Sequence, residues 1–210
     1  MNIYHCKKTK ERIVIDGNIQ KPQWRDIEEI SLVDTVTGNK PQQDTRVRLA
    51  WDDEFLYAAF ECEDRYIKAT MTEYNDPLYE EEVVEIFIDD DCDLKTYIEV
   101  EVNPLNTLLH YGIHNNLKGS FLKFARTDKV VDTAVVVSED EKKWKVEIAI
   151  PFSELIIAPN IPPKSGDRWR MNFYRIDRGQ FGEDEYSAWK PTGVVNFHMP
   201  EKFGEIVFVE

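Results

Sequence analysis

The sequence predicts an all-β protein, an immunoglobulin-like or jelly-roll-type antiparallel β-sandwich with very little helix. Apolar and polar residues alternate with a period of two in many short segments, which is the pattern of half-buried strands. Turn-forming residues separate these segments at intervals of about 8–12 residues, as in sandwiches and barrels. Helical periodicity is scarce and no linker or repeat divides the chain, so we expect one domain over residues 1–210.

Five strands are predicted in the first half of the chain. Residues 46–51 and 55–60 alternate cleanly around a turn at Asp52-Asp53-Glu54, which is the pattern of a hairpin. Three more strands are expected after it, joined by the Asp-rich stretch 89–93 and by the turn residues 103–106. They span residues 83–89, 97–103 and 107–114.

The second half of the chain continues the pattern. Residues 130–138 and 143–150 are predicted to form a hairpin around the polar turn 139–142. Proline is tolerated at the first position of a helical turn, so a single turn is expected to begin at Pro151. Residues 169–176 and 205–209 complete the predicted strands.

Alternation also assigns side chains to the two faces of the sheet. Val84, Ile86 and Ile88 share one face of their strand, which leaves Glu85 on the other. The neighbouring strands give the same division, so one sheet is expected to have an apolar inner face and an outer face rich in carboxylates, imidazoles and phenols. The predicted outer-face residues are Glu85, Phe87, Asp89, Tyr97, Glu99, Glu101, Asn103, His110, Gly112, His114, Arg170, Asn172 and Tyr174.

The net charge narrows the classes of partner. Forty acidic and 26 basic side chains give a formal charge of −14, and this potential repels nucleic acid and anionic lipid. We therefore expect neither nucleic acid nor a membrane as partner. The amino-terminal residues contain no apolar stretch typical of a signal peptide, so the sequence as it stands is expected to be cytoplasmic, or secreted if a leader has been removed.

Aromatic rings and carboxylates together suggest a sugar ligand. Flat rings cover the apolar face of a pyranose, while fixed polar groups bond its hydroxyls. Rings of this kind are expected in loops and polar groups on strands. The candidate residues are Tyr79, Trp189, Phe197, Glu85, Glu99, Glu101 and Asn172.

Other chemistries use the same residue types. Glu85 with Glu99 or Glu101 could form the carboxylate pair of a glycosidase. The Asp89–Asp93 run offers oxygen ligands for a cation, but it lacks the glycine and final acidic residue of an EF-hand loop, which favours a solvated turn. His110 and His114 share one face of a strand about 13 Å apart, too far to chelate one ion.

Seven segments, in order and spacing, resemble the carbohydrate-binding modules of family 9, which belong to a wider group of DOMON-like β-sandwiches. The resemblance covers roughly Ile13 to Phe208 and implies a non-catalytic module that binds glucan or xylan saccharides at their reducing ends, in carbohydrate catabolism. The segments are IDGNIQKPQW, VRLAWDDEFLYAAFECED, EEEVVEIFIDDD, YIEVEVNPLNTLLH, WKVEIAIPFSEL, MNFYRID and FHMPEKFGEIVF.

The family's sugar site carries over by motif. A pair of aromatic rings sandwiches the sugar in the best-understood members, backed by a glutamate that corresponds to Glu85. The first ring falls on Tyr79, six residues before Glu85, and the second on Phe197, three residues before Pro200. Beside them, His198 and Trp189 are candidates for further contact.

This chain departs from the family pattern in two ways. Both ring positions are tryptophan in the sugar-binding members, and here they are tyrosine and phenylalanine. A basic residue expected on the following strand is replaced by Glu99 or Glu101, which removes a partner for the sugar hydroxyls.

The resemblance also bears on cofactors and partners. No cofactor is firmly implied, although calcium has a structural role in some members. A glycosidase is the expected partner, because such modules usually accompany one. Some DOMON relatives bind haem between methionine and histidine, and the candidates for that alternative are His198, Met199 and His110.

Overall fold

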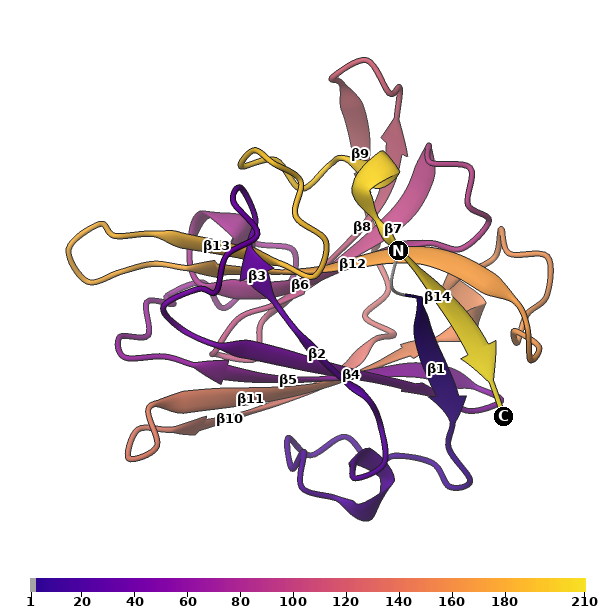
Figure 1. The fold of residues 1–210 in the computed structure, drawn as a ribbon, viewed down its shortest axis with the longest axis horizontal. Coiled ribbons are helices and arrows are strands. Elements are labelled where there is room, and N and C mark those ends of the chain that lie inside the picture. The colour runs from indigo at the N-terminus through magenta and orange to yellow at the C-terminus, as the bar shows by residue number, and fades with distance from the viewer. Residues whose placement is uncertain (1–2) are drawn as a thin grey trace.

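The computed structural model describes residues 3–210, which fold almost entirely into strands (Figure 1). Hydrogen bonds link the strands of this part of the chain into one mixed sheet. The strands are β1 Tyr4–Lys8, β2 Glu29–Ser31, β3 Val33–Asp34, β4 Thr45–Trp51, β5 Phe55–Glu63, β6 Val83–Asp89, β7 Thr96–Val102, β8 Leu108–Asn115, β9 Phe121–Ala125, β10 Asp132–Ser138, β11 Lys143–Pro151, β12 Arg168–Asp177, β13 Glu185–Ala188 and β14 Gly204–Val209.

Helical structure among the described residues is limited to short 3-10 turns, as the sequence predicts. One of them begins directly after Pro151, where a single turn was expected. Within residues 3–210 no helix is long and apolar enough to cross a membrane. The turns are η1 Pro22–Trp24, η2 Leu78–Glu80, η3 Phe152–Glu154 and η4 Pro200–Lys202.

The sheet folds into two layers that enclose the main core (Figure 1). The first layer has the strand order β10-β11-β5-β4-β1, and the second has the order β14-β12-β6-β7-β8-β9. β1 runs parallel to both β4 and β14, so it joins the two layers at one side. The predicted sandwich is therefore confirmed, but it is mixed rather than purely antiparallel. Core residues from both layers include Val47, Phe60, Val146, Ile86, Val100 and Phe173.

Both predicted hairpins are present. β4 and β5 pair along their whole length, and β10 pairs with β11 in the same way. At the first turn, the Asp52 carboxylate accepts the backbone N–H groups of Glu54 and Phe55, which fixes the reversal of the chain. β6, β7 and β8 form an antiparallel meander beside β12. This four-strand region has one face on the main core and the other directed outward.

The segment before β2 covers the outside of the first layer. Ile13, Ile19 and Trp24 pack against outward residues of β5 and β11 in a second apolar cluster. Glu147 of β11 is fully buried beneath this segment. Its carboxylate accepts hydrogen bonds from the Trp24 indole, from the Lys21 ammonium and from the backbone N–H of Gly17. A buried acceptor of this kind pins an otherwise irregular segment to the sheet.

A buried arginine connects the two layers at one end of the sandwich. Arg175 of β12 is 1% exposed and forms ion pairs with Asp64, Glu82 and Asp177 at 3.1, 2.8 and 3.0 Å. It also donates to the backbone carbonyl of Glu63 at 2.6 Å. Since Asp64 follows β5 and Glu82 precedes β6, the guanidinium holds together segments of different layers.

The structure differs from the sequence prediction at β8. The sequence prediction placed His110 on the outer face, and so its chain neighbours Leu109 and Tyr111 on the inner one. These two instead pair with Glu101 and Glu99 and lie on the outer face. His110 instead pairs with Val100 and is buried on the core side. The prediction failed because the outer face is itself covered here, so apolar residues do not mark the inner side.

Candidate functional site

A pocket of about 320 Å³ lies on the outer face of the second layer, away from the main core. Small-molecule sites in proteins start at about this size. β6 and β7 contribute Glu85, Phe87 and Glu99 to its lining. We call it the aromatic pocket, and its other main lining residues are Tyr79, Phe121, Lys123, Arg178, Phe197 and His198.

Phe197 is held in place by a stacked tyrosine. Its ring lies 4.1 Å from that of Tyr174, with 9° between the two planes. The Tyr174 hydroxyl, on β12, donates to the backbone carbonyl of Phe197 at 3.1 Å. Tyr186 meets the Phe197 ring edge-on at 6.4 Å. One face of Phe197 is therefore covered by protein, and the ring is fixed before any ligand arrives.

Tyr79, a second ring of the pocket lining, is held in place by a lysine. It lies in η2, and its hydroxyl accepts a hydrogen bond of 2.9 Å from the Lys123 ammonium. The same ammonium lies 4.6 Å from the centre of the Tyr79 ring and 5.2 Å from that of Tyr111, within the range of cation–π contacts. Lys123 therefore fixes the orientation of Tyr79.

His198 forms another part of the aromatic lining. Its imidazole stacks on Phe121, with ring centres 3.7 Å apart and 27° between the planes. Its Nδ1 shares a hydrogen bond of 2.9 Å with the Tyr97 hydroxyl. Burial, assisted by the positive charge of Lys123, lowers the pKa of His198 to about 4. The imidazole is therefore neutral at physiological pH and contributes a polar ring rather than a charge.

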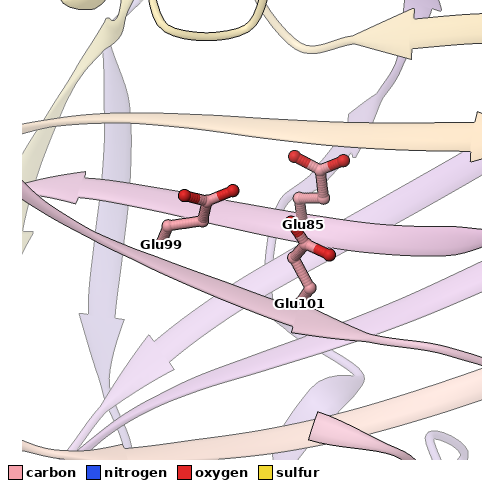
Figure 2. Close-up of side chains that lie close together, drawn as sticks. All are labelled: Glu85, Glu99 and Glu101. Carbon is pink, nitrogen blue, oxygen red and sulfur yellow. The ribbon is translucent and has the colours of Figure 1, made fainter. Parts of the chain in front are cut away.

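Three glutamates from two neighbouring strands lie beneath the rings. Glu85 of β6 pairs with Glu101 of β7, and Glu99 follows on the same face (Figure 2). One carboxylate oxygen from each lies within 4.8 Å of the others. All three side chains are buried: Glu85 is 1% exposed, Glu99 is 4% exposed and Glu101 is 0% exposed. We call these three residues the glutamate cluster. Glu85 and Glu99 line the pocket, and Glu101 lies outside the lining.

The glutamate cluster has strongly perturbed acidity. Burial, with repulsion from Glu99, raises the pKa of Glu85 well above its usual range. Burial and repulsion from both neighbours do the same to the pKa of Glu101, and burial raises the pKa of Glu99. Three like charges this close in a low-dielectric site cannot all be carried at once. The cluster therefore holds at least one proton or requires a cation.

The basic groups nearest to the cluster are committed to other partners. Lys123 bonds Tyr79, as described above. Arg178 donates to the Asp184 carboxylate and the Tyr186 hydroxyl, both at 2.7 Å, and to the Tyr79 carbonyl at 2.9 Å. Among residues 3–210, neither base forms an ion pair with a member of the glutamate cluster. They reduce the negative potential of the pocket without neutralising the buried carboxylates directly.

The structure brings together most of the residues that the sequence predicted for a sugar site. Those that line the aromatic pocket are Tyr79, Glu85, Glu99, Phe197 and His198. Their role in carbohydrate binding stays a prediction. Asn172 and Trp189, which the sequence analysis placed with them, lie outside the lining.

Asn172 and Trp189 have structural partners instead. The Asn172 amide donates to the Tyr174 hydroxyl and the Lys190 carbonyl and is fully buried. Trp189 packs on the main core beside Tyr4 and Phe173. Its ring also covers the backbone at Gly204, where any side chain would collide with it. Trp189 therefore does not supply a third ring to the pocket.

Sequence reasoning missed the two basic residues and one of the rings. Phe121 and Lys123 come from β9, a strand that was not predicted, and Arg178 directly follows β12. Alternation of Phe121, Lys123 and Ala125 was the available signal. Lys123 and Arg178 therefore bring positive charge to the pocket that the sequence analysis did not place there.

The residues considered for haem do not converge. His110 lies on the core side of β8, while His198 packs against Phe87 on the outer face. They are therefore on opposite sides of the sheet. One haem could therefore not take both histidines as axial ligands. Ligation by Met199 with one of them, the arrangement expected from the resemblance, stays a prediction.

The Asp-rich stretch after β6 forms a hydrogen-bonded turn. Asp89 accepts the N–H groups of Asp93 and Leu94, and Asp93 accepts those of Lys95 and Thr96. The oxygens of Asp89, Asp91 and Asp93 also lie within 4.8 Å of one another. Backbone N–H groups therefore already bond the carboxylates of Asp89 and Asp93. The need to bond these N–H groups in a tight turn accounts for the acidic residues here without a bound ion.

Comparison with known proteins gives relatives over nearly the whole chain. A protein of Arthroderma benhamiae named "Extracellular protein" is 27% identical, and the match covers 92% of this chain and 91% of the fungal one. A solved structure from Bacteroides uniformis has a TM-score of 0.79 at 20% identity and covers 97% of both chains.

A family 9 carbohydrate-binding module of Caldicellulosiruptor kristjanssonii, solved with cellotriose, has a TM-score of 0.71 at 19% identity. That comparison covers 99% of this chain and 94% of the module. These solved structures confirm the fold. The model of the family described as "Carbohydrate family 9 binding domain-like" matches residues 15–210. This match covers nearly the whole chain, including the strands that build the aromatic pocket. The chain therefore belongs to the carbohydrate family 9 binding domains, a family of carbohydrate-binding rather than catalytic modules.

Proposed function

We propose that this protein binds the end of a glucan- or xylan-type saccharide in the aromatic pocket. The observation that carries the proposal is the arrangement of Tyr79 and Phe197, two separately fixed rings that line one pocket above Glu85 and Glu99. Rings of this kind cover the C–H face of a pyranose, and the carboxyl groups bond its hydroxyls. The solved C. kristjanssonii modules in complex with cellotriose and with glucose support this choice of ligand class.

The size of the pocket favours a chain end over a long chain. At about 320 Å³ it lies at the lower limit of ordinary ligand sites, which suits one or two sugar rings. The reducing end is the part of a saccharide that we propose enters it, as the family resemblance implies. An extended polysaccharide lying across the surface would instead need an open row of rings.

Titration calorimetry tests the proposal directly. Cellotriose and xylotriose should bind with a Kd between about 1 μM and 1 mM, and one of them more tightly than glucose. The sugar alcohol made by reducing cellotriose should bind at least about 10-fold more weakly, because its terminal ring is opened. Equal affinity for cellotriose and its alcohol would contradict the reducing-end proposal but not saccharide binding. Absence of binding for every sugar would contradict both.

The carboxylate spacing raises glycoside hydrolysis as a second candidate. A retaining glycosidase needs two carboxylates about 5–5.5 Å apart, and the closest oxygens of Glu85 and Glu99 lie within 4.8 Å. The nucleophile must be ionised, however, and burial raises the pKa of both groups. We therefore propose a non-catalytic role. Cleavage of chromogenic glycosides that is lost in Glu85→Gln would overturn this view.

The remaining expectations concern the setting in which the protein works. A glycosidase acting on the same saccharide is the partner that a module of this kind would serve. That partner and the cytoplasmic location expected from the sequence stay predictions.

A further inference from the structure

We propose that Glu85, Glu99 and Glu101 form a binding site for a hard divalent cation of the calcium type beneath the aromatic pocket. Carboxylate oxygens are the ligands that Ca²⁺ prefers, at 2.3–2.6 Å. Two oxygens on one such ion therefore lie no more than about 5 Å apart. The glutamate cluster meets this condition, because its three ligand oxygens all lie within 4.8 Å of one another.

The second observation is that the cluster's oxygens are buried and unpartnered. Neither carboxylate oxygen of Glu101 has a hydrogen-bond partner, although the side chain is 0% exposed. One buried oxygen of Glu85 and one of Glu99 are in the same condition. The three carboxyl groups project from one face of β6 and β7 toward a common region (Figure 2). Buried polar atoms without partners are rare in folded proteins, and here four belong to three adjacent carboxyl groups.

Neighbouring groups do not meet this need. Lys123 and Arg178 influence the cluster through charge, but their hydrogen bonds go to Tyr79, Tyr186 and Asp184. The contrast with the Asp-rich turn is direct. The carboxylates of Asp89 and Asp93 accept backbone N–H groups, whereas those of the glutamate cluster receive none. Of the two acidic groups with metal-compatible spacing among residues 3–210, the glutamate cluster is the one with buried oxygens that lack a hydrogen-bond partner.

Access to the ion would come from the pocket. Glu85 and Glu99 line the pocket, while Glu101 is fully buried and lies outside the lining. Three carboxylates do not fill the 6–8 oxygen positions of Ca²⁺, so water or ligand hydroxyls would complete the shell on the pocket side. A sugar hydroxyl bound to the ion is the one part of this inference that rests on the proposed function. The ion would then supply positive charge at the strand of Glu99 and Glu101, where the resemblance leads one to expect a basic residue.

Ion binding is tested first without any sugar. The chelator-treated protein is titrated with Ca²⁺ by calorimetry and with Tb³⁺ by luminescence, for which Tyr111 is a nearby donor. We expect one ion per chain at this site and a higher Tm in Ca²⁺. Glu101→Gln and Glu85→Gln should each weaken binding at least about 10-fold. Both changes are isosteric, and circular dichroism with a thermal melt verifies that each variant folds.

A matched control separates the two acidic groups. Asp91→Asn removes one charge from the Asp-rich turn but keeps the oxygen that accepts the Asp93 N–H. It should leave the affinity for Ca²⁺ within about 2-fold of the unmodified protein. Loss of binding in Asp91→Asn with retention in Glu101→Gln would overturn the proposal. So would a folded protein that binds neither Ca²⁺ nor Tb³⁺ at millimolar concentration.

A last titration separates this inference from the proposed function. Cellotriose is titrated in Ca²⁺ and again in chelator. Ion binding without sugar binding would contradict the proposed function and leave the cation site standing. Equal sugar binding in both buffers, in a protein that takes up no ion, would contradict the cation site and leave the proposed function standing.

Discussion

Glu85 and Glu101 face each other directly across β6 and β7, and both are buried. Within the described part of the chain, neither oxygen of Glu101 has a hydrogen-bond partner, and one oxygen of Glu85 lacks one as well. Like charges in this arrangement destabilise a sheet. In the absence of divalent cations, Glu101→Gln should therefore raise the free energy of unfolding at about pH 8 by about 1 kcal/mol or more, since one unit of pKa shift corresponds to about 1.4 kcal/mol. Urea denaturation of the two proteins in chelator measures the difference.

The pH dependence of that difference follows from the raised pKa values. Between the unfolded pKa of Glu near 4.5 and the higher folded values, the folded state holds more protons than the unfolded state. Stability is therefore lost as the pH rises from about 5 to 8. Lys123 and Arg178 oppose this loss but stay charged throughout the range. The slope should be smaller in Glu101→Gln, and an equal slope in both proteins would contradict ionisation of this cluster.

The rings of Tyr79 and Phe197 should account for most of the saccharide affinity. Phe197→Ala and Tyr79→Ala are each expected to weaken cellotriose binding about 10-fold, because each removes a stacking surface worth about 1 kcal/mol. Calorimetry measures the change. Phe124→Ala is the matched control, since Phe124 is 58% exposed on β9 and does not line the pocket. Comparable losses in the control would show that the affinity does not come from the pocket rings.

Arg175 should be far more important for stability than a surface arginine of the same strand. Arg175→Met leaves Asp64, Glu82 and Asp177 buried without their cation, and loss of one partner in such a pair costs about 3–5 kcal/mol. Arg168→Met breaks only an exposed pair with Glu205 and should cost less than about 1 kcal/mol. Thermal melts of both variants at neutral pH compare the two. Equal costs would mean that the buried network does not hold the layers together.

His198 should stay neutral well below the usual range of histidine. With its pKa at about 4, its ring signals in an NMR titration should not move between about pH 8 and 5.5. The unfolded state takes up this proton first, so the contribution of His198 to stability is lost as the pH falls from about 6.5 toward 4. The effect is opposite in sign to that of the glutamates. A midpoint near 6.5 for His198 would contradict its burial against Phe121.

The strands could be predicted from the sequence wherever one face was buried and the other was not. β4 follows this rule in its first half, and its bounds differ from the prediction by one residue. In β6 all seven residues are buried, and this strand was found because apolar residues alternate with Glu85 and Asp89 in the sequence. β9 was missed because all five of its residues are exposed. β1 was missed because it is only five residues long and pairs in parallel with β4 and with β14, the last strand of the chain, and short-range alternation carries no signal for such pairing.

The site could be predicted only where a motif carried it. Tyr79, Glu85 and Phe197 follow from fixed spacings within two segments. Trp189 was misplaced because a loop ring covers the core or a ligand with equal ease, and its packing on Gly204 depends on the tertiary fold. Lys123 was missed for the same reason, since it reaches Tyr79 from 44 residues away in the chain.

Lys123 connects all parts of the pocket, and its removal should affect each of them. It bonds the Tyr79 hydroxyl at 2.9 Å and lies over the Tyr79 ring at 4.6 Å. Its charge also lowers the pKa of Glu99 and, after burial, that of His198. Lys123→Met should therefore weaken cellotriose binding about 10-fold by freeing the Tyr79 ring, and it should move the pKa of His198 upward.

Calorimetry and an NMR titration of His198 measure these two effects of Lys123→Met separately. Lys118→Met is the control, because Lys118 is exposed in the turn between β8 and β9. The control removes one positive charge from the same hairpin at a distance from the rings. If both variants lose affinity equally, the net charge of the protein is responsible. If only Lys123→Met does, the lysine acts by holding Tyr79 in place against the sugar.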